Sequence, residues 1–178
     1  MSDTMSDSME TSAGAATKPT PESVEGVGST TARASSVSEW VDSEKNTVLR
    51  FTRSMPGLDG HTAWQVLAAE DARPFLFLQS QSQSSLTLLV IEPRLVVENY
   101  SPVIAREVLS EFGFDDAAHH LLLSIVTVGS NGRSTMNLKA PIVVCPSSMK
   151  AVQVILESGD WPIHYPLYPD DTGEDPNE

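Results

Sequence analysis

Alternation of apolar and polar residues with a period of two dominates the middle of the chain. Leu49 and Phe51 alternate with Arg50 and Thr52, which predicts a half-buried β-strand that ends at the turn signal Met55-Pro56-Gly57. Further strands are expected at residues 64–68, 75–79, 86–91, 120–128, 134–145 and 152–156. The strands at 75–79 and 86–91 are apolar at nearly every position, so we expect both of their faces to be covered.

A hairpin is predicted where residues 129–132 interrupt two of these strands. This stretch contains an Asn-Gly pair, which supplies the positive φ angles of a tight turn. In the second arm of the hairpin, Met136 and Leu138 are expected to point inward and Asn137 outward, because successive side chains of a strand alternate between its faces.

One short helix interrupts the β pattern. It is expected to begin with Ser101 as N-cap and Pro102 at the first helical position, and to stop near Gly113. Residues 115–119 are expected to add one more turn. About seven strands against one or two short helices indicate a mainly β fold, a small antiparallel barrel or sandwich-like domain.

The composition divides the chain into three parts. Residues 1–40 are rich in small polar residues and are expected to form a disordered leader; residues 41–168 carry the β-rich domain, and residues 169–178 form an acidic disordered tail. The formal charge of the chain is −13, but residues 41–167 hold 13 acidic and 9 basic residues, which leaves −4. Because polyanion binding relies on Lys and Arg, we expect no direct nucleic-acid binding and favour basic protein partners.

The single cysteine, Cys145, follows the apolar run 142–144 and is expected to pack as a small hydrophobe. One thiol cannot form an intramolecular disulfide, which fits a reducing cytoplasm. No secretion signal and no stretch of about 18 apolar residues is found, so we expect a soluble cytoplasmic protein without membrane contact.

Chemistry-bearing motifs are missing from the sequence. His119 and His120 are adjacent, so their side chains point in different directions, and no Cys pair or His-Glu-x-x-His motif completes a zinc site. No Gly-rich phosphate loop and no Gly-x-Ser-x-Gly motif occurs. We therefore expect no enzyme, cofactor or metal, and keep a hydrolase using His164 or His119 as a remote alternative.

The order of several segments resembles the FliW family. They are the turn 55–58, the strand 74–80 ending in Leu-Gln-Ser, the strand 86–91, the Val-Thr-Val strand at 126–128, the stretch Asn-Leu-Lys-Ala-Pro-Ile-Val-Val at 137–144, and Gln-Val-Ile-Leu at 153–156. The resemblance covers roughly residues 48–167. It departs from the family where His164 stands in place of an arginine and Leu58 in place of a common Phe.

The resemblance implies a flagellar assembly factor that works by mutually exclusive binding of two proteins. One is flagellin; the other is CsrA, a small RNA-binding repressor of flagellin translation. Free factor would bind CsrA and relieve repression, whereas accumulating flagellin would occupy the factor and release CsrA. The chain is expected to be a monomer when free. A dedicated flagellin chaperone without CsrA binding is the alternative implied by His164.

Residues that the sequence marks as candidates for partner contact lie in turns, at strand ends and on outward faces. They are Pro56, Gly57, Gln79, Asn137, Pro141, Gln153 and His164. Each also has a structural interpretation: a turn for Pro56-Gly57, capping of its own sheet for Gln79, and protection of an edge or bulge for Pro141. Phe75 and Phe77, in contrast, are assigned to the core. We expect Asn137→Asp to leave folding intact and to weaken partner binding.

Overall fold

The computed structural model describes residues 36–37, 40–41, 47–114, 120–130, 132–157 and 159–168. The chain separates into two units, Met1–Ala32 and Arg33–Glu178, and all described residues belong to the second. The predicted helical turn at 115–119, the predicted tail at 169–178 and most of the predicted leader lie outside the described residues.

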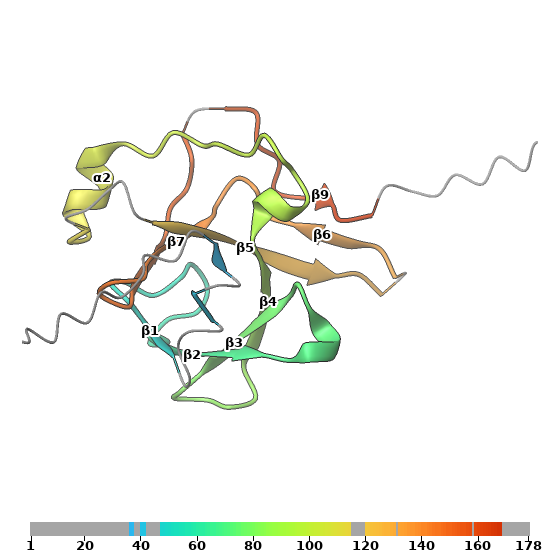
Figure 1. The fold of residues 1–178 in the computed structure, drawn as a ribbon. Coiled ribbons are helices and arrows are strands. Elements are labelled where there is room, and N and C mark those ends of the chain that lie inside the picture. Colours follow the sequence, from blue (N-terminus) through green and yellow to red (C-terminus); the bar gives the residue numbers. More distant parts are fainter. Residues whose placement is uncertain are drawn as a thin grey trace, which may run out of the picture. The chain divides into compact units, whose positions relative to one another are not determined.

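Nine strands build one continuous sheet (Figure 1). They are β1 (Val48–Phe51), β2 (Ala63–Ala68), β3 (Leu76–Ser80), β4 (Thr87–Ile91), β5 (Leu121–Val128), β6 (Ser134–Met136), β7 (Ile142–Cys145), β8 (Lys150–Gln153) and β9 (Tyr165–Pro166). The strand order is β4-β3-β2-β1-β8-β7-β5-β6-β9, and β4 also pairs with β5. That pairing closes seven strands into a barrel, which confirms the predicted mainly β fold.

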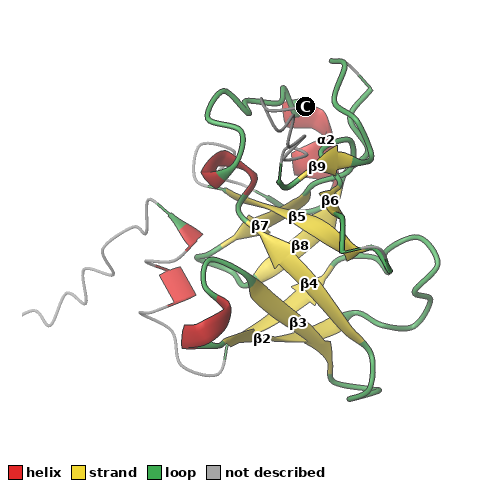
Figure 2. Cartoon of the chain, turned by 90° about the vertical axis from the view of Figure 1, so that its right-hand side faces the viewer, coloured by secondary structure: helices red, strands yellow, loops and turns green. Residues whose placement is uncertain are grey.

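The pairings depart from the predicted antiparallel pattern at one place. β1 and β8 run parallel, with Arg50 opposite Lys150 and Phe51 opposite Ala151, while the other pairings are antiparallel. β6 and β9 extend the sheet beyond β5, outside the closed ring (Figure 2). The two-residue strand β9 carries no apolar alternation and was not predicted.

A first hydrophobic core fills the inside of the barrel. Because the side chains of a strand alternate between its two faces, every second residue points into the barrel. Examples are Leu49, Trp64 and Leu78, which are all fully buried. Val37 and Trp40 belong to this core, each only 3% exposed. Both residues belong to the stretch 1–40, and composition alone does not show that two apolar residues of a polar stretch reach the barrel.

A second hydrophobic core lies on the outside of the barrel. Outward side chains of β4, β5, β7 and β8 pack against a covering layer formed by the 3₁₀ helix η2 (Pro93–Leu95), the helix α2 (Arg106–Glu111) and the chain around Trp161 and Tyr165. Another 3₁₀ turn, η1 (Glu70–Ala72), joins β2 to β3. This second layer explains why strands that are apolar at nearly every position are covered on both faces.

The helix begins later than the sequence predicts. Residues 101–105 lie outside any helix, Ala105 is extended with ψ of 137°, and no side chain caps the start of α2. Tyr100 and Ile104 pack into the second core from this extended segment. Tertiary packing thus overrides the local signal of Ser101 and Pro102, since that signal describes only the chain's own preference.

The strand predicted at 134–145 is broken into β6 and β7. Met136 pairs with Val126 and Ile142 with Leu123, so five residues, 137–141, stand opposite only Ser124 and Ile125. This is a wide bulge, and Leu138 within it is fully buried. The final predicted strand is also shifted, because β8 ends at Gln153 and residues 154–156 leave the ladder.

Candidate functional site

Three of the predicted contact residues, Asn137, Pro141 and Gln153, come together at the bulge between β6 and β7. The side-chain oxygen of Asn137 accepts the backbone N–H of Ala140 at 2.9 Å, and Nε2 of Gln153 donates to the carbonyl of Ala140 at 3.1 Å. The carbonyl of Pro141 accepts the N–H of Val154 at 3.0 Å, and Pro141 is buried. This cluster shapes the bulge, and contact of its members with a partner stays a prediction.

The bulge is also fastened to the covering layer. The hydroxyl of Tyr100 donates to the carbonyl of Leu138 at 2.8 Å, and the N–H of Leu138 donates to the carbonyl of Pro162 at 3.0 Å. The ring of Trp161 packs edge-on against Tyr100, with 4.7 Å between centroids. Burial raises the pKa of the Tyr100 phenol, because a phenolate cannot be solvated there.

The remaining predicted contact residues lie on three other segments, the loop between β1 and β2, the strand β3 and the stretch that leads into β9. Pro56 and Gly57 form the exposed tip of the loop between β1 and β2, where Gly57 has φ of +80°. Gln79 is half-buried at the end of β3, and its Nε2 donates to the carbonyl of Ser84 at 3.0 Å. His164 is exposed beside β9.

The sheet register reveals a feature that sequence reasoning missed, a row of apolar side chains across the outer face. Each member is the direct cross-strand partner of the next, so all point to the same side. From β2 to β9 the row reads Leu67, Phe77, Leu89, Val126, Met136 and Tyr165. Figure 2 looks onto the strands that carry it. We call these six residues the outer row.

From Met136 toward β2 the side chains of the outer row become more exposed, and Tyr165 at the other end is half-buried. Met136 is fully buried and Val126 is 7% exposed, because the covering layer lies over them. Leu89 is half-buried at the margin of the second core, Phe77 is half-buried beyond it, and Leu67 is 39% exposed. The covering layer thus stops short, and the Leu67 end of the row is left as exposed apolar surface.

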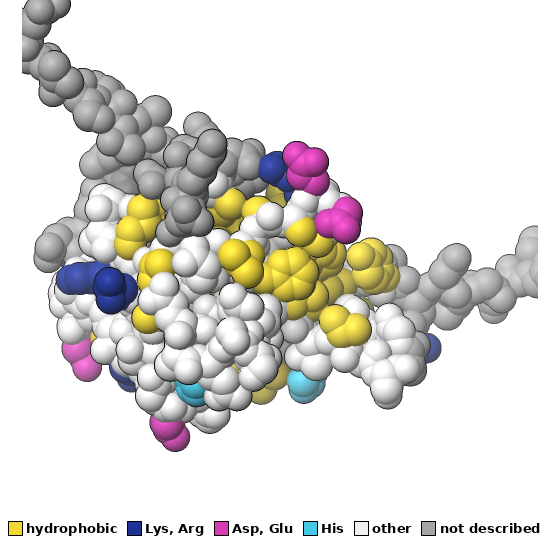
Figure 3. Space-filling view, turned by 90° about the horizontal axis from the view of Figure 1, so that it is seen from below, with side chains coloured by type: hydrophobic (Ala, Val, Ile, Leu, Met, Phe, Trp, Pro, Cys, Tyr) yellow, Lys and Arg dark blue, Asp and Glu magenta, His cyan; other side chains and the backbone are white. Residues whose placement is uncertain are grey.

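This arrangement corrects the assignment of Phe77 to the core, whereas Phe75 packs against the second core as a partly buried side chain. Leu76 and Leu78 point into the barrel, so the two aromatic side chains between and before them lie on the outer side and are half-buried. The signal that could have found them is the unbroken apolar run 75–78 itself, because a strand that is apolar on both sides needs a second partner surface. Viewed from the side of β2 and β3, hydrophobic side chains gather on the surface (Figure 3).

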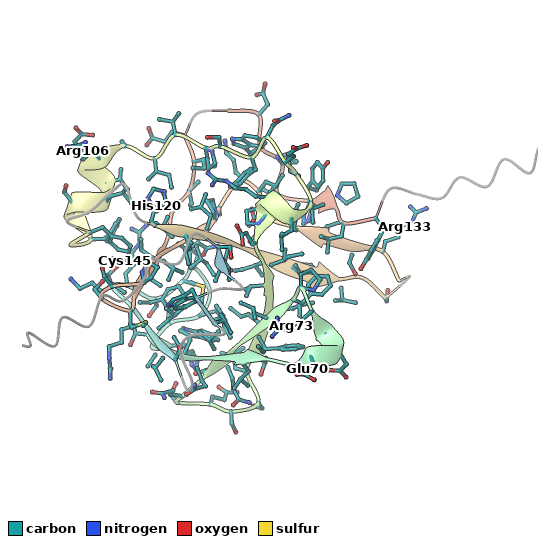
Figure 4. The ribbon with its side chains drawn as sticks, in the orientation of Figure 1. Glu70, Arg73, Arg106, His120, Arg133 and Cys145 are labelled. Atoms are coloured by element: carbon teal, nitrogen blue, oxygen red, sulfur yellow. The ribbon has the colours of Figure 1, made fainter. Side chains whose placement is uncertain are left out.

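A cavity of about 220 Å³ adjoins the exposed end of the outer row. Phe75, two residues from Phe77 on the same side, is among its lining residues, with Ala68 next to Leu67. The other lining residues are Val37, Val41, Arg73, Pro74, Leu76, Glu92 and Leu95. Its walls are mostly apolar, and Glu70 and Arg73 lie close by at η1 (Figure 4). The surface can receive an apolar side chain from another polypeptide.

In the described part of the chain, the His, Cys, Asp and Glu side chains do not gather into a recognisable reaction centre. There, no three or more His, Cys, Asp and Glu side chains are arranged to hold a metal ion. Nδ1 of His61 lies 2.8 Å from Oγ of Ser80 and 2.9 Å from Oγ of Ser82, which links the loop before β2 to the end of β3 and the residues after it. His119 lies outside the described residues.

The cysteine packs as the sequence predicts. Cys145 is 5% exposed and belongs to the second core. Burial acts to raise its pKa, but hydrogen bonds with Ser147 and Ser148 outweigh burial and lower the pKa of the thiol overall.

Among the described residues, no helix has the length and apolar character needed to cross a membrane.

Comparison with known proteins was made for sequence and for structure. The family model described as "FliW protein" matches residues 34–167. The flagellar assembly factor FliW of Heliobacterium modesticaldum is 32% identical over 130 residues, which cover 72% of this chain and 85% of that protein. That of Thermosipho africanus is 28% identical over 129 residues, covering 71% and 89%.

The fold agrees with the sequence comparison. A solved structure described as a crystal structure of the flagellar assembly factor FliW superposes with a TM-score of 0.64 at 27% identity, covering 72% of this chain and 90% of that one. The family match also begins before Trp40, in keeping with the burial of that residue in the first core. The barrel, its covering layer and the matched sequence together place this chain in the FliW family of flagellar assembly factors.

Proposed function

We propose that this chain acts in the cytoplasm as a binding regulator that holds either flagellin or the translational repressor CsrA, but not both together. Membership of a family named for flagellar assembly supports a role in building the flagellum. Binding of CsrA would free flagellin translation, and binding of surplus flagellin would release CsrA. The regulation then needs no catalysis, only competition between two partners for one protein.

The observation that carries this proposal is the exposed end of the outer row. Leu67 and Phe77 continue the second core sideways into solvent, beside a mostly apolar cavity. A small domain seldom leaves connected apolar surface of this kind without a partner that covers it. Burial of such a patch drives association, at roughly 25 cal/mol for each Å² removed from water.

Competition follows if both partners cover the same patch. Two proteins that bury the same side chains cannot be bound at once, so occupancy by the more abundant one excludes the other. A rise in free flagellin would then displace CsrA by mass action alone. The described residues require no hinge or second site for this behaviour.

Calorimetric titration tests the proposal directly. Purified full-length chain is titrated with flagellin and with CsrA, and the CsrA titration is repeated after saturation with flagellin. We expect binding of each partner alone and loss of the CsrA signal in the saturated sample. Binding of both at the same time would contradict the competition.

Substitutions locate the contact. Phe77→Ser should weaken both complexes by about 30-fold, as expected for a central apolar contact, and Leu67→Ser should act in the same direction. Ile155→Ser is the matched control, because Ile155 is also exposed, at 60%, but follows β8, which lies three strands from β3 in the sheet. Equal loss in the control, or unchanged affinity in Phe77→Ser, would remove the outer row from the interface.

The departure at His164 favours a second candidate, a flagellin chaperone that does not bind CsrA. The FliW resemblance places an arginine at this position, and the exposed imidazole of His164 lacks the forked guanidinium that an arginine would offer a carboxylate. The same titrations separate the two: a chaperone binds flagellin normally and gives no heat with CsrA. His164→Arg would then restore CsrA binding if this position alone accounts for the loss.

A further inference from the structure

Three basic side chains lie together on the seam where β1 and β8 run parallel. Arg50 and Lys150 are direct cross-strand partners on the outer face, since Leu49 and Phe51 point into the barrel. Arg53 follows the end of β1 by two residues and reaches across the same seam to Gln153. We call Arg50, Arg53 and Lys150 the cationic seam.

Uncharged groups contact the charged ends of two of these side chains, Arg53 and Lys150. The guanidinium of Arg53 lies over the ring of Phe112, 4.7 Å from its centroid, and its Nη2 donates to the carbonyl of Gln153 at 3.3 Å. Nζ of Lys150 donates to the carbonyl of Gly113 at 3.2 Å, just beyond the end of α2. These contacts hold the side chains in place, and neither contact supplies a negative charge.

The third member, Arg50, is exposed on β1. Among the described residues, the structure gives no carboxylate partner to any member of the seam. Two Lys or Arg side chains lie next to each other at the left of Figure 3, the side on which Figure 1 shows β1. Like charges placed directly opposite each other in a sheet are destabilising, so folding alone does not explain Arg50 opposite Lys150.

The overall charge makes the seam unusual for this chain. The formal charge is −13, with 24 acidic against 11 Lys and Arg residues. Three of those 11 gather on one surface, and contacts already hold the charged groups of Arg53 and Lys150, which lowers the entropy lost when a ligand binds. Neighbouring strands lie about 4.8 Å apart, a spacing that lets Arg50 and Lys150 meet two carboxylates of one peptide.

We propose that the cationic seam is a docking site for an acidic segment of a protein partner. The seam is separate from the outer row. The exposed end of that row is Leu67 on β2, whereas the seam lies on β1 and β8, which follow β2 in the strand order. An acidic peptide fits better than RNA, since three cations give few phosphate contacts. The inference rests on the proposed function only in taking the ligand to be protein.

The test uses the full-length chain and a short synthetic Glu-rich peptide. Chemical shifts of backbone amides are followed during titration at low and high salt. We expect shifts to concentrate at residues 50–53 and 150–153 and around Gly113, and binding to weaken as salt rises. The same peptide with Gln in place of Glu should not bind. Equal binding of the Gln peptide would overturn the proposal.

Substitutions supply the matched control. Arg50→Glu should weaken the peptide roughly fivefold, in the range of a single exposed charge pair reversed in sign. Arg106→Glu makes the same change in net charge on α2, where Figure 4 shows Arg106, and should leave affinity unchanged. An equal effect of both variants would mean that overall charge, and not the seam, attracts the peptide, and the proposal would fail.

An RNA oligonucleotide forms the last arm of the experiment. If RNA displaces the peptide at lower concentration than the peptide itself binds, the seam is a nucleic-acid site and the proposal is overturned. The peptide results do not depend on flagellin or CsrA. Failure of both proteins to bind would therefore contradict the proposed function and leave the docking site supported. Failure of the peptide to bind would contradict the docking site and leave the proposed function supported.

Discussion

The side-chain oxygen of Asn137 accepts the backbone N–H of Ala140 at 2.9 Å, inside the bulge that separates β6 from β7. This bond closes the turn locally, as Asn side chains often do. Asn137→Ala should therefore destabilise the fold by about 1 kcal/mol, because the Ala140 N–H loses its acceptor, whereas Asn137→Asp keeps an acceptor oxygen and should stay near wild-type stability.

Urea unfolding followed by tryptophan fluorescence measures both variants. Gln153→Ala serves as a companion, since its amide donates to the carbonyl of Ala140 in the same bulge. Equal stability of Asn137→Ala and the wild type would show that the bulge is held by its other contacts. A destabilised Asn137→Asp would argue that the carboxylate cannot replace the amide at this site.

Alkaline pH should destabilise the fold through Tyr100. Burial raises the pKa of Tyr100 above its ordinary value of 10.0, so the unfolded chain releases this proton before the folded one does. The contribution to stability is complete below pH 10 and is lost as pH rises above it. Unfolding free energy measured against pH should fall in that window.

Tyr100→Phe tests the assignment. It should cost about 1–2 kcal/mol at neutral pH, because the carbonyl of Leu138 loses the hydroxyl at 2.8 Å, and it should flatten the alkaline decline. Tyr168→Phe is the control, since Tyr168 is 66% exposed. An alkaline decline that is just as steep in Tyr100→Phe would assign the effect to another group.

Two members of the outer row should respond differently to truncation. Met136→Ala should cost about 2–4 kcal/mol, because Met136 is fully buried under the covering layer and its loss leaves a cavity. Leu67→Ala should cost less than about 1 kcal/mol, because that side chain is 39% exposed. Urea unfolding of both variants compares a covered member of the row with an exposed one. Similar losses would mean that Leu67 is covered in solution.

Much of the barrel could be predicted from the sequence, because strand alternation is a local property. The inward set that includes Leu49, Trp64 and Leu78 follows from period-two spacing, and a strand keeps that spacing whatever it packs against. The register between strands does not follow, since it depends on which residues of distant segments meet. The outer row runs through five such pairings and could not be seen in the sequence alone.

The candidate site was predicted only in part. Asn137, Pro141 and Gln153 are brought together by the bulge, but the structure turns their polar groups toward the chain itself. The residues that form exposed apolar surface, Leu67 and Phe77, resemble core residues in sequence because hydrophobicity does not state which face a side chain occupies.

The sequence by itself determined that this chain forms a small β-rich domain of the FliW family, since its apolar alternation and ordered segments are local features. Only the tertiary structure decided where that domain is left incomplete. The covering layer of η2 and α2 ends before Leu67, and the parallel pairing of β1 with β8 sets Arg50 beside Lys150. Both surfaces arise from contacts between residues far apart in the chain, which no local pattern encodes.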